Sequence, residues 1–313
     1  MRLMTLGLLL LPFAALAAPA PGIPDGWADG YAYANGIRIH YYRAVPAPGK
    51  PVVVMVHGVT DNGLNWAVLS SKLQDNFDIY MLDARGHGLS DPFTSSDDGD
   101  TLVRDVVAFV QAMGIEKPIL VGHSMGAATA MRVGAEHPDV ARAIIMLDPG
   151  LGRWPPLPKP GETAAAPPPA ETEAAAPDRL ALSMRGSPRE LVAQNNYRFE
   201  DLVATCRRQS QKWSFTSCQY WALSKKQFHG AYSEQTWQAI AGPMRTGDSL
   251  AKIQVPALIL KADAPLDTRK THQEIASVMP RGRLVHIDGG GHNLHHDEPE
   301  TTLEAINEFF STL

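Results

Sequence analysis

The sequence is poor in cysteine and in clustered positive charge, and each shortage excludes a class of protein. Only two cysteines, Cys206 and Cys218, occur among 313 residues, and without nearby histidines they make a poor zinc site. The formal net charge is -5 and no basic run occurs, which argues against a nucleic-acid partner. Phosphate-loop, dinucleotide and metal motifs are absent too. We therefore expect neither a cofactor nor a bound metal.

Long hydrophobic runs are also missing, apart from one near the N-terminus. An early arginine, an apolar run over Leu6–Leu16 and the small-residue triplet ending at Ala17 are typical of a cleavable signal peptide. The run is too short to span a bilayer comfortably, so we expect no stable membrane anchor. Residues 1–17 are predicted to be this signal, with the mature protein periplasmic or secreted. In an exported protein an isolated cysteine pair favours one disulfide, Cys206–Cys218.

What is present is the pattern of a globular α/β protein, with 44% hydrophobic and 19% charged residues. Apolar positions alternate around Asn35-Gly36, which predicts a hairpin over Trp27–Ala44. Short, continuously apolar segments follow, as expected for strands buried on both faces of a parallel sheet. The predicted strands are 51–56, 77–82, 118–121, 143–147, 255–260 and 283–287, and the predicted helices are 64–73, 100–113, 124–136, 269–278 and 299–310. Strand–helix alternation predicts a mostly parallel sheet flanked by helices.

This alternation is interrupted between residues 151 and 247. A segment rich in proline, alanine and glutamate, residues 154–177, is predicted to be a mobile loop. Two helical stretches rich in tryptophan and tyrosine follow it. We interpret residues 151–247 as a helical cap inserted into a core built from residues 18–150 and 248–313.

A serine flanked by glycines, in Gly122-His123-Ser124-Met125-Gly126, falls between a predicted strand and a predicted helix. Such a turn exposes Ser124 in a strained conformation, with the positive helix N-terminus behind it. Serine is a poor nucleophile without a base, and His292 is the candidate. It follows three glycines after the last predicted strand, in a loop able to return to the carboxyl edge of the sheet.

An oxyanion hole needs backbone N–H groups that face the developing negative charge. The amide of Met125, at the start of the helix, is one predicted donor. The turn His57-Gly58-Val59-Thr60 follows the strand that ends at Val56, and we expect the Val59 amide to be the second donor.

Four motifs now stand in order: HG at His57-Gly58, DARGHGLSD at Asp83–Asp91, GHSMG at Gly122–Gly126 and GGGH at Gly289–His292. In this order they resemble the α/β-hydrolase superfamily over almost the whole mature length. The segment His57–Trp66 is similar to a bacterial subgroup of capped serine hydrolases. The resemblance implies an α/β-hydrolase fold, a structural role for the DARGHG loop and a Ser-His-acid triad. A serine nucleophile argues against epoxide hydrolases and haloalkane dehalogenases, which use a carboxylate.

The acid of the triad is ambiguous in this sequence. In most of the superfamily it lies three residues beyond a glycine, but here that glycine is Ala262 and the expected position is Pro265. Asp263 comes too early and Asp267 too late. Asp148, at the end of the strand before the cap, matches the position used by some branches of the family. We favour Asp148, with Asp263 as the alternative and Asp267 as the third candidate.

These residues predict a serine hydrolase that forms an acyl-enzyme, with a small-molecule carboxylic ester or lactone as its substrate. Two other readings stay open. One is a ligand-binding or signalling protein on a hydrolase scaffold, and the other is a hydrolase of amide or carbon–carbon bonds. Neither the bond nor the oligomeric state follows from the sequence.

Overall fold

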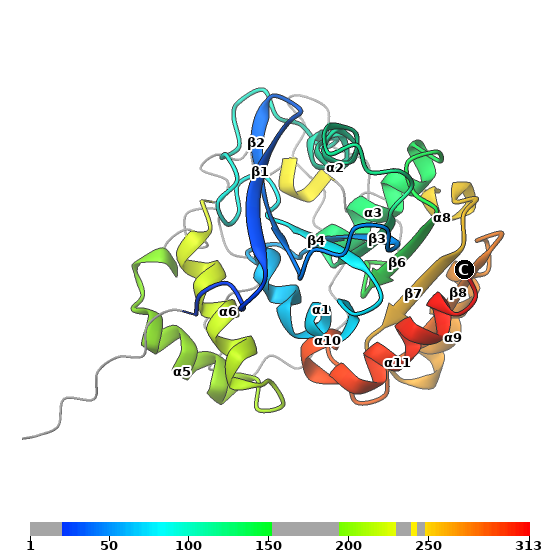
Figure 1. Ribbon diagram of the computed structural model, residues 1–313. Helices are drawn as coiled ribbons and strands as arrows, with labels where there is room; N and C mark the ends of the chain where they lie inside the picture. Colours follow the sequence, from blue (N-terminus) through cyan, green and yellow to red (C-terminus); the bar gives the residue numbers. More distant parts are fainter. Residues whose placement is uncertain (1–20, 152–193, 230–238, 243–247) are drawn as a thin grey trace, which may run out of the picture.

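The computed structural model describes residues 21–151, 194–229, 239–242 and 248–313. The predicted signal peptide and the predicted mobile segment 154–177 lie outside these residues. The described part is built around one sheet, shown in Figure 1 with helices on both faces. All of the strands and helices named below belong to it.

The sheet has eight strands in the order β1-β2-β4-β3-β5-β6-β7-β8. The first two strands form the hairpin predicted around Asn35-Gly36, and β2 pairs antiparallel with β4. All remaining pairs are parallel. This is the mostly parallel α/β-hydrolase architecture that the sequence predicted. The strands are β1 (Ala28–Ala34), β2 (Ile37–Arg43), β3 (Val52–Val56), β4 (Asp78–Leu82), β5 (Ile119–His123), β6 (Ala143–Leu147), β7 (Ala257–Lys261) and β8 (Gly282–His286).

The central strands β4, β5, β6 and β7 are buried along their whole length, because helices cover both faces of the sheet. One hydrophobic core joins the sheet to α2 (Thr101–Ala112), α3 (Met125–Glu136) and α8 (Ser249–Lys252). The other core joins the opposite face to α1 (Ala67–Leu73) and α11 (Pro299–Phe310). Two further helices, α9 (Leu266–Ala276) and α10 (Leu294–Asp297), stand before β8 and α11 in the chain. Burial on both sides explains why these strands have continuous rather than alternating hydrophobicity.

Two predicted helices begin differently from the expectation: α9 starts at Leu266 rather than at residue 269, and the helix predicted over 64–73 has a different first turn. The segment predicted as a single helix over 64–73 starts with a 3-10 turn, η1 (Gly63–Trp66), before α1 begins. The side chain of Asn62 accepts a hydrogen bond from the Leu64 amide at 3.1 Å and so starts this tighter turn. This turn begins shortly after the predicted oxyanion turn, with Asp61 and Asn62 between them.

Between β6 and β7 the chain forms η2 (Gln194–Asn196), α5 (Phe199–Gln209) and α6 (Phe215–Gln227), within the predicted insertion. A disulfide joins Cys206 on α5 to Cys218 on α6, as the sequence predicted. These two helices share a small core that includes both half-cystines and Trp213. In turn, α6 packs against η1 and α1, so the insertion contacts the core near the predicted oxyanion turn (Figure 1). Across the described ranges, helices with the length and apolar character needed to cross a membrane are absent.

Candidate active site

Ser124 stands on the tight turn between β5 and α3. Its backbone has φ 51° and ψ -114°, a left-handed conformation that residues with a side chain rarely adopt. The flanking glycines are required by space. A Cβ at Gly122 would lie 2.2 Å from the Gly126 carbonyl oxygen, and a Cβ at Gly126 would lie 2.0 Å from the Val56 oxygen. The turn therefore presents Ser124 at the carboxyl edge of the sheet, as in a nucleophile elbow.

Asp148 lies directly after β6, on the strand next to β5. It too has a positive φ, 45°, and its amide donates to the Leu260 carbonyl at 2.7 Å. One carboxylate oxygen lies 2.6 Å from the Lys261 Nζ and accepts a hydrogen bond from the Ala262 amide at 3.2 Å. The other faces the Nδ1 of His292 at 2.6 Å. Burial raises the pKa of Asp148, but its hydrogen bond to His292 and the charge of Lys261 outweigh burial and hold that pKa well below its usual range.

His292 lies in the loop between β8 and α10, next to the serine turn. The Nε2 of His123, the residue before Ser124, donates to the His292 carbonyl at 2.9 Å, and the two rings lie 4.8 Å apart. Because Asp148 is ionised, the His292 Nδ1 is the donor of their hydrogen bond, which leaves Nε2 as the basic nitrogen. Burial lowers the pKa of His292, but the hydrogen bond and the charge of Asp148 together raise it above its ordinary value. The side chain is 48% exposed.

The two alternative acids have other contacts. Asp263 is exposed, pairs with Arg269, and accepts a hydrogen bond from the Gly289 amide at 2.9 Å. Its own amide donates to the Gly290 carbonyl at 2.8 Å. Asp263 thus braces the glycine loop that carries His292, while Asp148 is the aspartate in hydrogen-bond contact with the ring. Asp267 is exposed in the first turn of α9.

The predicted oxyanion turn is held from two sides. His57 is buried, with its Nδ1 donating to the Gly58 carbonyl at 2.7 Å and its Nε2 accepting from the Ala84 amide at 3.0 Å. From α6, the buried Lys225 Nζ donates to the Thr60 carbonyl at 2.9 Å, to the Thr60 hydroxyl at 2.8 Å and to Asp61 at 3.1 Å. Thr60 has φ 65°, so these contacts stabilise a strained residue next to Val59.

The Met125 amide, the other predicted donor, belongs to the first turn of α3. The first four amides of a helix have no partner within that helix, so this amide is free to face an anion at the serine turn. The Met125 side chain is fully buried in the core formed around Phe228 and Ile240. That packing fixes the position of the first turn of α3 behind Ser124.

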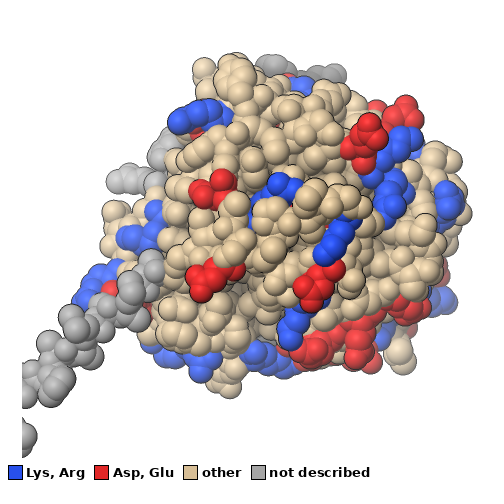
Figure 2. Space-filling model, in the orientation of Figure 1, with Lys and Arg blue, Asp and Glu red and all other residues tan. Residues whose placement is uncertain are grey.

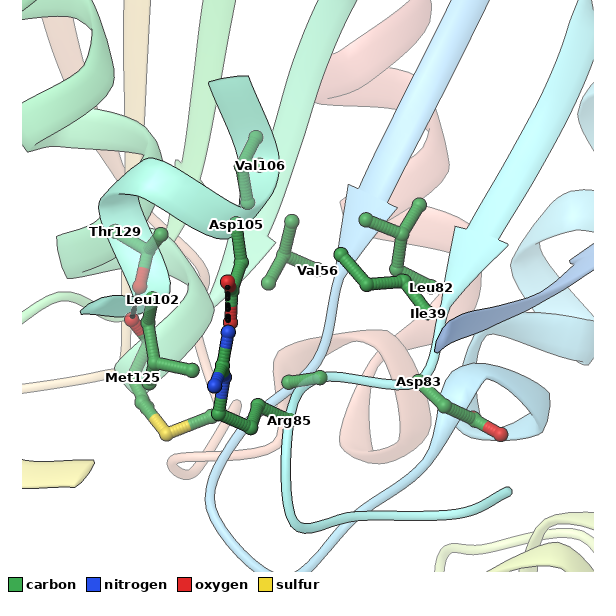
Figure 3. A pocket seen from close by; sticks show the side chains of 11 residues that line it. Ile39, Val56, Leu82, Asp83, Arg85, Leu102, Asp105, Val106, Met125 and Thr129 are labelled. Carbon is green, nitrogen blue, oxygen red and sulfur yellow. Dashed lines mark hydrogen bonds and ion pairs between the residues drawn. The ribbon is translucent and has the colours of Figure 1, made fainter. Parts of the chain in front are cut away.

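The DARGHG loop, Asp83–Gly88, contacts the start of the 3-10 turn η1 through the side chain of Asp83. Asp83 accepts hydrogen bonds from the Gly63 amide at 2.7 Å and the Leu89 amide at 2.9 Å, and it pairs with the buried His40 at 2.8 Å. Figure 3 shows Arg85 reaching Asp105 on α2 across a small cavity next to Met125. Apolar side chains such as Ile39, Val56 and Leu102 line this cavity together with Arg85 and Asp105.

Charged side chains of both signs are mixed on one face of the surface (Figure 2). On the face shown in Figure 2, Lys and Arg side chains are interspersed with acidic ones, and acidic side chains gather near α11. This face carries no continuous basic stripe of the kind that tracks a nucleic-acid backbone. Among the residues that the structure describes, no three His, Cys, Asp or Glu side chains are grouped so that they could hold a metal ion.

Several residues around the site were not singled out from the sequence. Lys261 contacts the carboxylate of Asp148, and Lys225 reaches the oxyanion turn from the insertion. A stack of aromatic rings runs from Trp66 through His295 and His296 to Trp213. A lysine at the end of a strand or within a helix carries no local pattern that distinguishes it from a surface lysine. Lys261 and Lys225 contact partners that are far away in the sequence, Asp148 and Thr60. Sequence spacing therefore could not reveal these contacts.

Comparison with known proteins identifies the fold independently. A family model described as "alpha/beta hydrolase fold" matches residues 51–299. An N-formylmaleamate deformylase of Pseudomonas putida is 27% identical over 288 residues, covering 90% of this chain and 96% of that protein. The crystal structure of an N-formylmaleamic acid deformylase from Pseudomonas putida superposes with a TM-score of 0.65 at 22% identity, covering 89% and 100% of the two chains. An enol-lactonase from Burkholderia xenovorans matches with a TM-score of 0.61 at 18% identity, over 90% and 100%.

Proposed function

The chain belongs to the α/β-hydrolase fold family, and on that premise we propose that it is an exported serine hydrolase that cleaves a carboxylic ester or lactone. Membership in this family, together with its similarity to a curated hydrolase, supports hydrolysis of a small molecule as the coarse activity. The finer proposal rests on one observation. Behind the strained Ser124 turn, Asp148 holds His292 at 2.6 Å in the tautomer that leaves Nε2 free to act as a base.

In the proposed reaction, Ser124 Oγ attacks the substrate carbonyl while His292 Nε2 takes the hydroxyl proton. The new C–O bond forms as the carbonyl π electrons move to oxygen, and the amides of Val59 and Met125 donate to that oxyanion. The imidazolium of His292 is stabilised by the charge of Asp148. When the tetrahedral intermediate collapses, the C–O bond to the leaving alcohol breaks and His292 returns the proton to it.

The second half of the reaction repeats these steps with water. His292 takes a proton from the water as its oxygen attacks the acyl carbonyl, and it then gives that proton to Ser124 Oγ as the ester bond breaks. The products are a carboxylic acid and the free enzyme. For a lactone, the acid and the alcohol remain on one molecule.

Lys261 gives the proposed acid a further property. Its ammonium contacts the same carboxylate that orients His292, so it favours the ionised form of Asp148. Its charge also lowers the pKa of His292, which limits the increase caused by Asp148. The first effect keeps the acceptor for the His292 Nδ1–H in place, and the second favours the neutral, basic form of the imidazole.

A second candidate, cleavage of an amide, is favoured by the comparison with N-formylmaleamate deformylase, which matches 90% of this chain. The same triad can attack an ester or an amide, and the difference lies in how well the leaving group is protonated. Labelling with a fluorophosphonate and turnover of matched p-nitrophenyl esters, lactones and N-acyl amides distinguish these possibilities. Labelling without turnover of any panel member would favour a binding or signalling role instead.

The failure of wild-type protein to label, under conditions where Ser124→Ala also fails, would remove the serine-hydrolase proposal. Export is supported by the composition of residues 1–17 and by the disulfide of the insertion, a bond that persists in oxidising compartments. N-terminal sequencing of the protein recovered from the periplasmic and culture fractions tests it. A full-length protein that starts at Met1 in the cytosol would contradict it.

A further inference from the structure

The loop between α5 and α6 contacts the segment that carries His292. In this loop Trp213 donates its indole N–H to one carboxylate oxygen of Asp297 at 2.7 Å. The other oxygen of Asp297 accepts a hydrogen bond from the Gly291 amide at 3.1 Å. Gly291 is the residue directly before His292. One carboxylate therefore connects a tryptophan of the inserted helices to the backbone of the proposed catalytic base.

A second contact from the same loop lies beside the first. The Nζ of Lys212 donates to the Gly289 carbonyl at 2.8 Å and pairs with Glu298. Lys212 and Trp213 thus reach the glycine loop at both of its ends. Lys212 is exposed, however, and an exposed ion pair contributes little to stability, so Trp213 is the stronger of the two contacts.

Trp213 is held firmly in its own element. Its side chain is buried with 5% exposure and packs in the small core that contains Cys206 and Cys218. Its ring also lies 4.3 Å from the ring of His296. The disulfide joins the two helices on either side of the loop, across a separation of 12 residues. These constraints limit the directions in which the indole N–H can point.

The histidine loop needs such anchoring. Three consecutive glycines, Gly289–Gly291, give the backbone more conformational freedom than any other composition. The ring of His292 is held by Asp148 and lies beside the ring of His123, but its side chain is half exposed, so the position of its backbone also depends on the loop. The hydrogen bond from Gly291 to Asp297 removes freedom at the residue next to the base. Burial raises the pKa of Asp297, although the hydrogen bonds from Trp213 and Gly291 act against this and favour the ionised acceptor.

From these contacts we propose that Trp213 is a positioning residue for His292, acting through Asp297 and the Gly291 amide. The proposal rests on the function proposed for Ser124 and His292. It gives the inserted helices a part in assembling the proposed base. In this proposal Trp213 contacts neither the substrate nor the ring of His292, and it acts by fixing the position of the loop that carries His292.

The test uses three variants: Trp213→Phe, Asp297→Asn and the double variant that combines these two changes. Trp27→Phe is the control for all three. Trp27 is a matched control, because it also donates its indole N–H to a side chain, Gln74 at 2.8 Å, outside the site. Trp213→Phe keeps an aromatic side chain near His296 and removes the N–H donor, together with part of the buried volume of the indole. We expect kcat and the rate of fluorophosphonate labelling to fall about 10- to 100-fold with KM nearly unchanged, because a base displaced by a fraction of an ångström works poorly.

The double variant should lose little more activity than Asp297→Asn alone, because both changes break the same connection. Trp27→Phe should stay within about twofold of wild type. Hydrogen exchange supplies a readout that does not depend on turnover. The amides of residues 289–292 should exchange faster in Trp213→Phe and at the wild-type rate in Trp27→Phe.

Wild-type kcat and wild-type exchange in Trp213→Phe would overturn the inference, and so would additive losses in the double variant. A rise in KM with kcat unchanged would also overturn it, because Trp213 would then bind substrate. If wild-type protein failed to label, the proposed function would fail. The exchange experiment would still decide whether Trp213 orders the loop.

Discussion

Replacing Asp148 by asparagine perturbs the proposed triad at a single atom. The carboxylate oxygen that faces His292 Nδ1 at 2.6 Å becomes an amide, while the size of the side chain hardly changes. An amide N–H in that place donates to Nδ1, so the imidazole must carry its proton on Nε2. In this tautomer the nitrogen that faces the substrate is no longer a base. The substitution also removes the negative charge that stabilises the imidazolium.

The two losses set the magnitude. A triad histidine held in the wrong tautomer lowers kcat by about 10³- to 10⁴-fold, which equals about 4–5.5 kcal/mol of transition-state stabilisation. Stability should fall as well, because the Lys261 ammonium loses its charged partner at 2.6 Å. Lys261 keeps its hydrogen bond to the Pro149 carbonyl at 3.0 Å, so we expect a loss of about 1–3 kcal/mol in unfolding free energy.

The assay measures kcat on the best substrate of the ester, lactone and amide panel, together with the rate of fluorophosphonate labelling. Asp263→Asn is the matched control, since Asp263 braces the Gly289 amide and pairs with Arg269. Its contacts are exposed, so kcat should fall by no more than about fivefold. Urea unfolding of each variant separates a loss of chemistry from a loss of folding. A folded Asp148→Asn variant with near-normal kcat, beside an inactive Asp263→Asn variant, would refute the assignment of the acid.

Three further predictions concern the base, the oxyanion turn and the insertion. A plot of kcat/KM against pH should fall on its acid side with a midpoint above 6.5. The reason is that the pKa of His292 is raised and only the neutral ring accepts a proton. A midpoint below 6.5 would contradict the structure. Lys225→Met should lower kcat about 10- to 100-fold, because it releases the oxyanion turn. Lys226→Met, at the more exposed neighbouring residue, should stay within about twofold of wild type. Equal losses in both variants would show that Lys225 does not hold the oxyanion turn for catalysis. Replacing Cys206 and Cys218 together by serine should lower the unfolding free energy by about 3 kcal/mol, which corresponds to the entropy of closing a loop of this length. Chemical denaturation measures this loss. An unchanged midpoint would show that the disulfide does not stabilise the fold.

The fold could be predicted from the sequence where one local pattern determines one element. The apolar runs at 143–147 and 255–260 predict strands because only burial on both faces tolerates such composition, and β6 and β7 occupy nearly the same residues. The Asn-Gly pair determines the first hairpin in the same local way. The 3-10 start before α1 was not predicted, because it depends on a hydrogen bond that the Asn62 side chain accepts from the Leu64 amide, which competes with helix geometry.

The candidate site divides along a similar line. Ser124 and His292 could be proposed from the sequence because glycines mark the turn and the loop that carry them. The choice among three aspartates needed the structure, because both Asp148 and Asp263 follow neighbouring strands and spacing alone cannot tell which carboxylate reaches Nδ1. The geometry brings Asp148 to the ring and Asp263 to the loop backbone. Lys225 and Trp213 were missed as site residues because they act from the insertion across long sequence separations.

The backbone at the site has a consequence for how this protein would respond to selection. Among the described residues, five with side chains have positive φ, and three of them are Thr60, Ser124 and Asp148. Glycine would relieve about 1 kcal/mol or more of backbone strain at such a position. Ser124→Gly would therefore lower the strain of the turn while it removes the proposed nucleophile. A library sorted only for resistance to heat would therefore enrich inactive chains. Any effort to make this protein more durable has to screen for turnover in the same round.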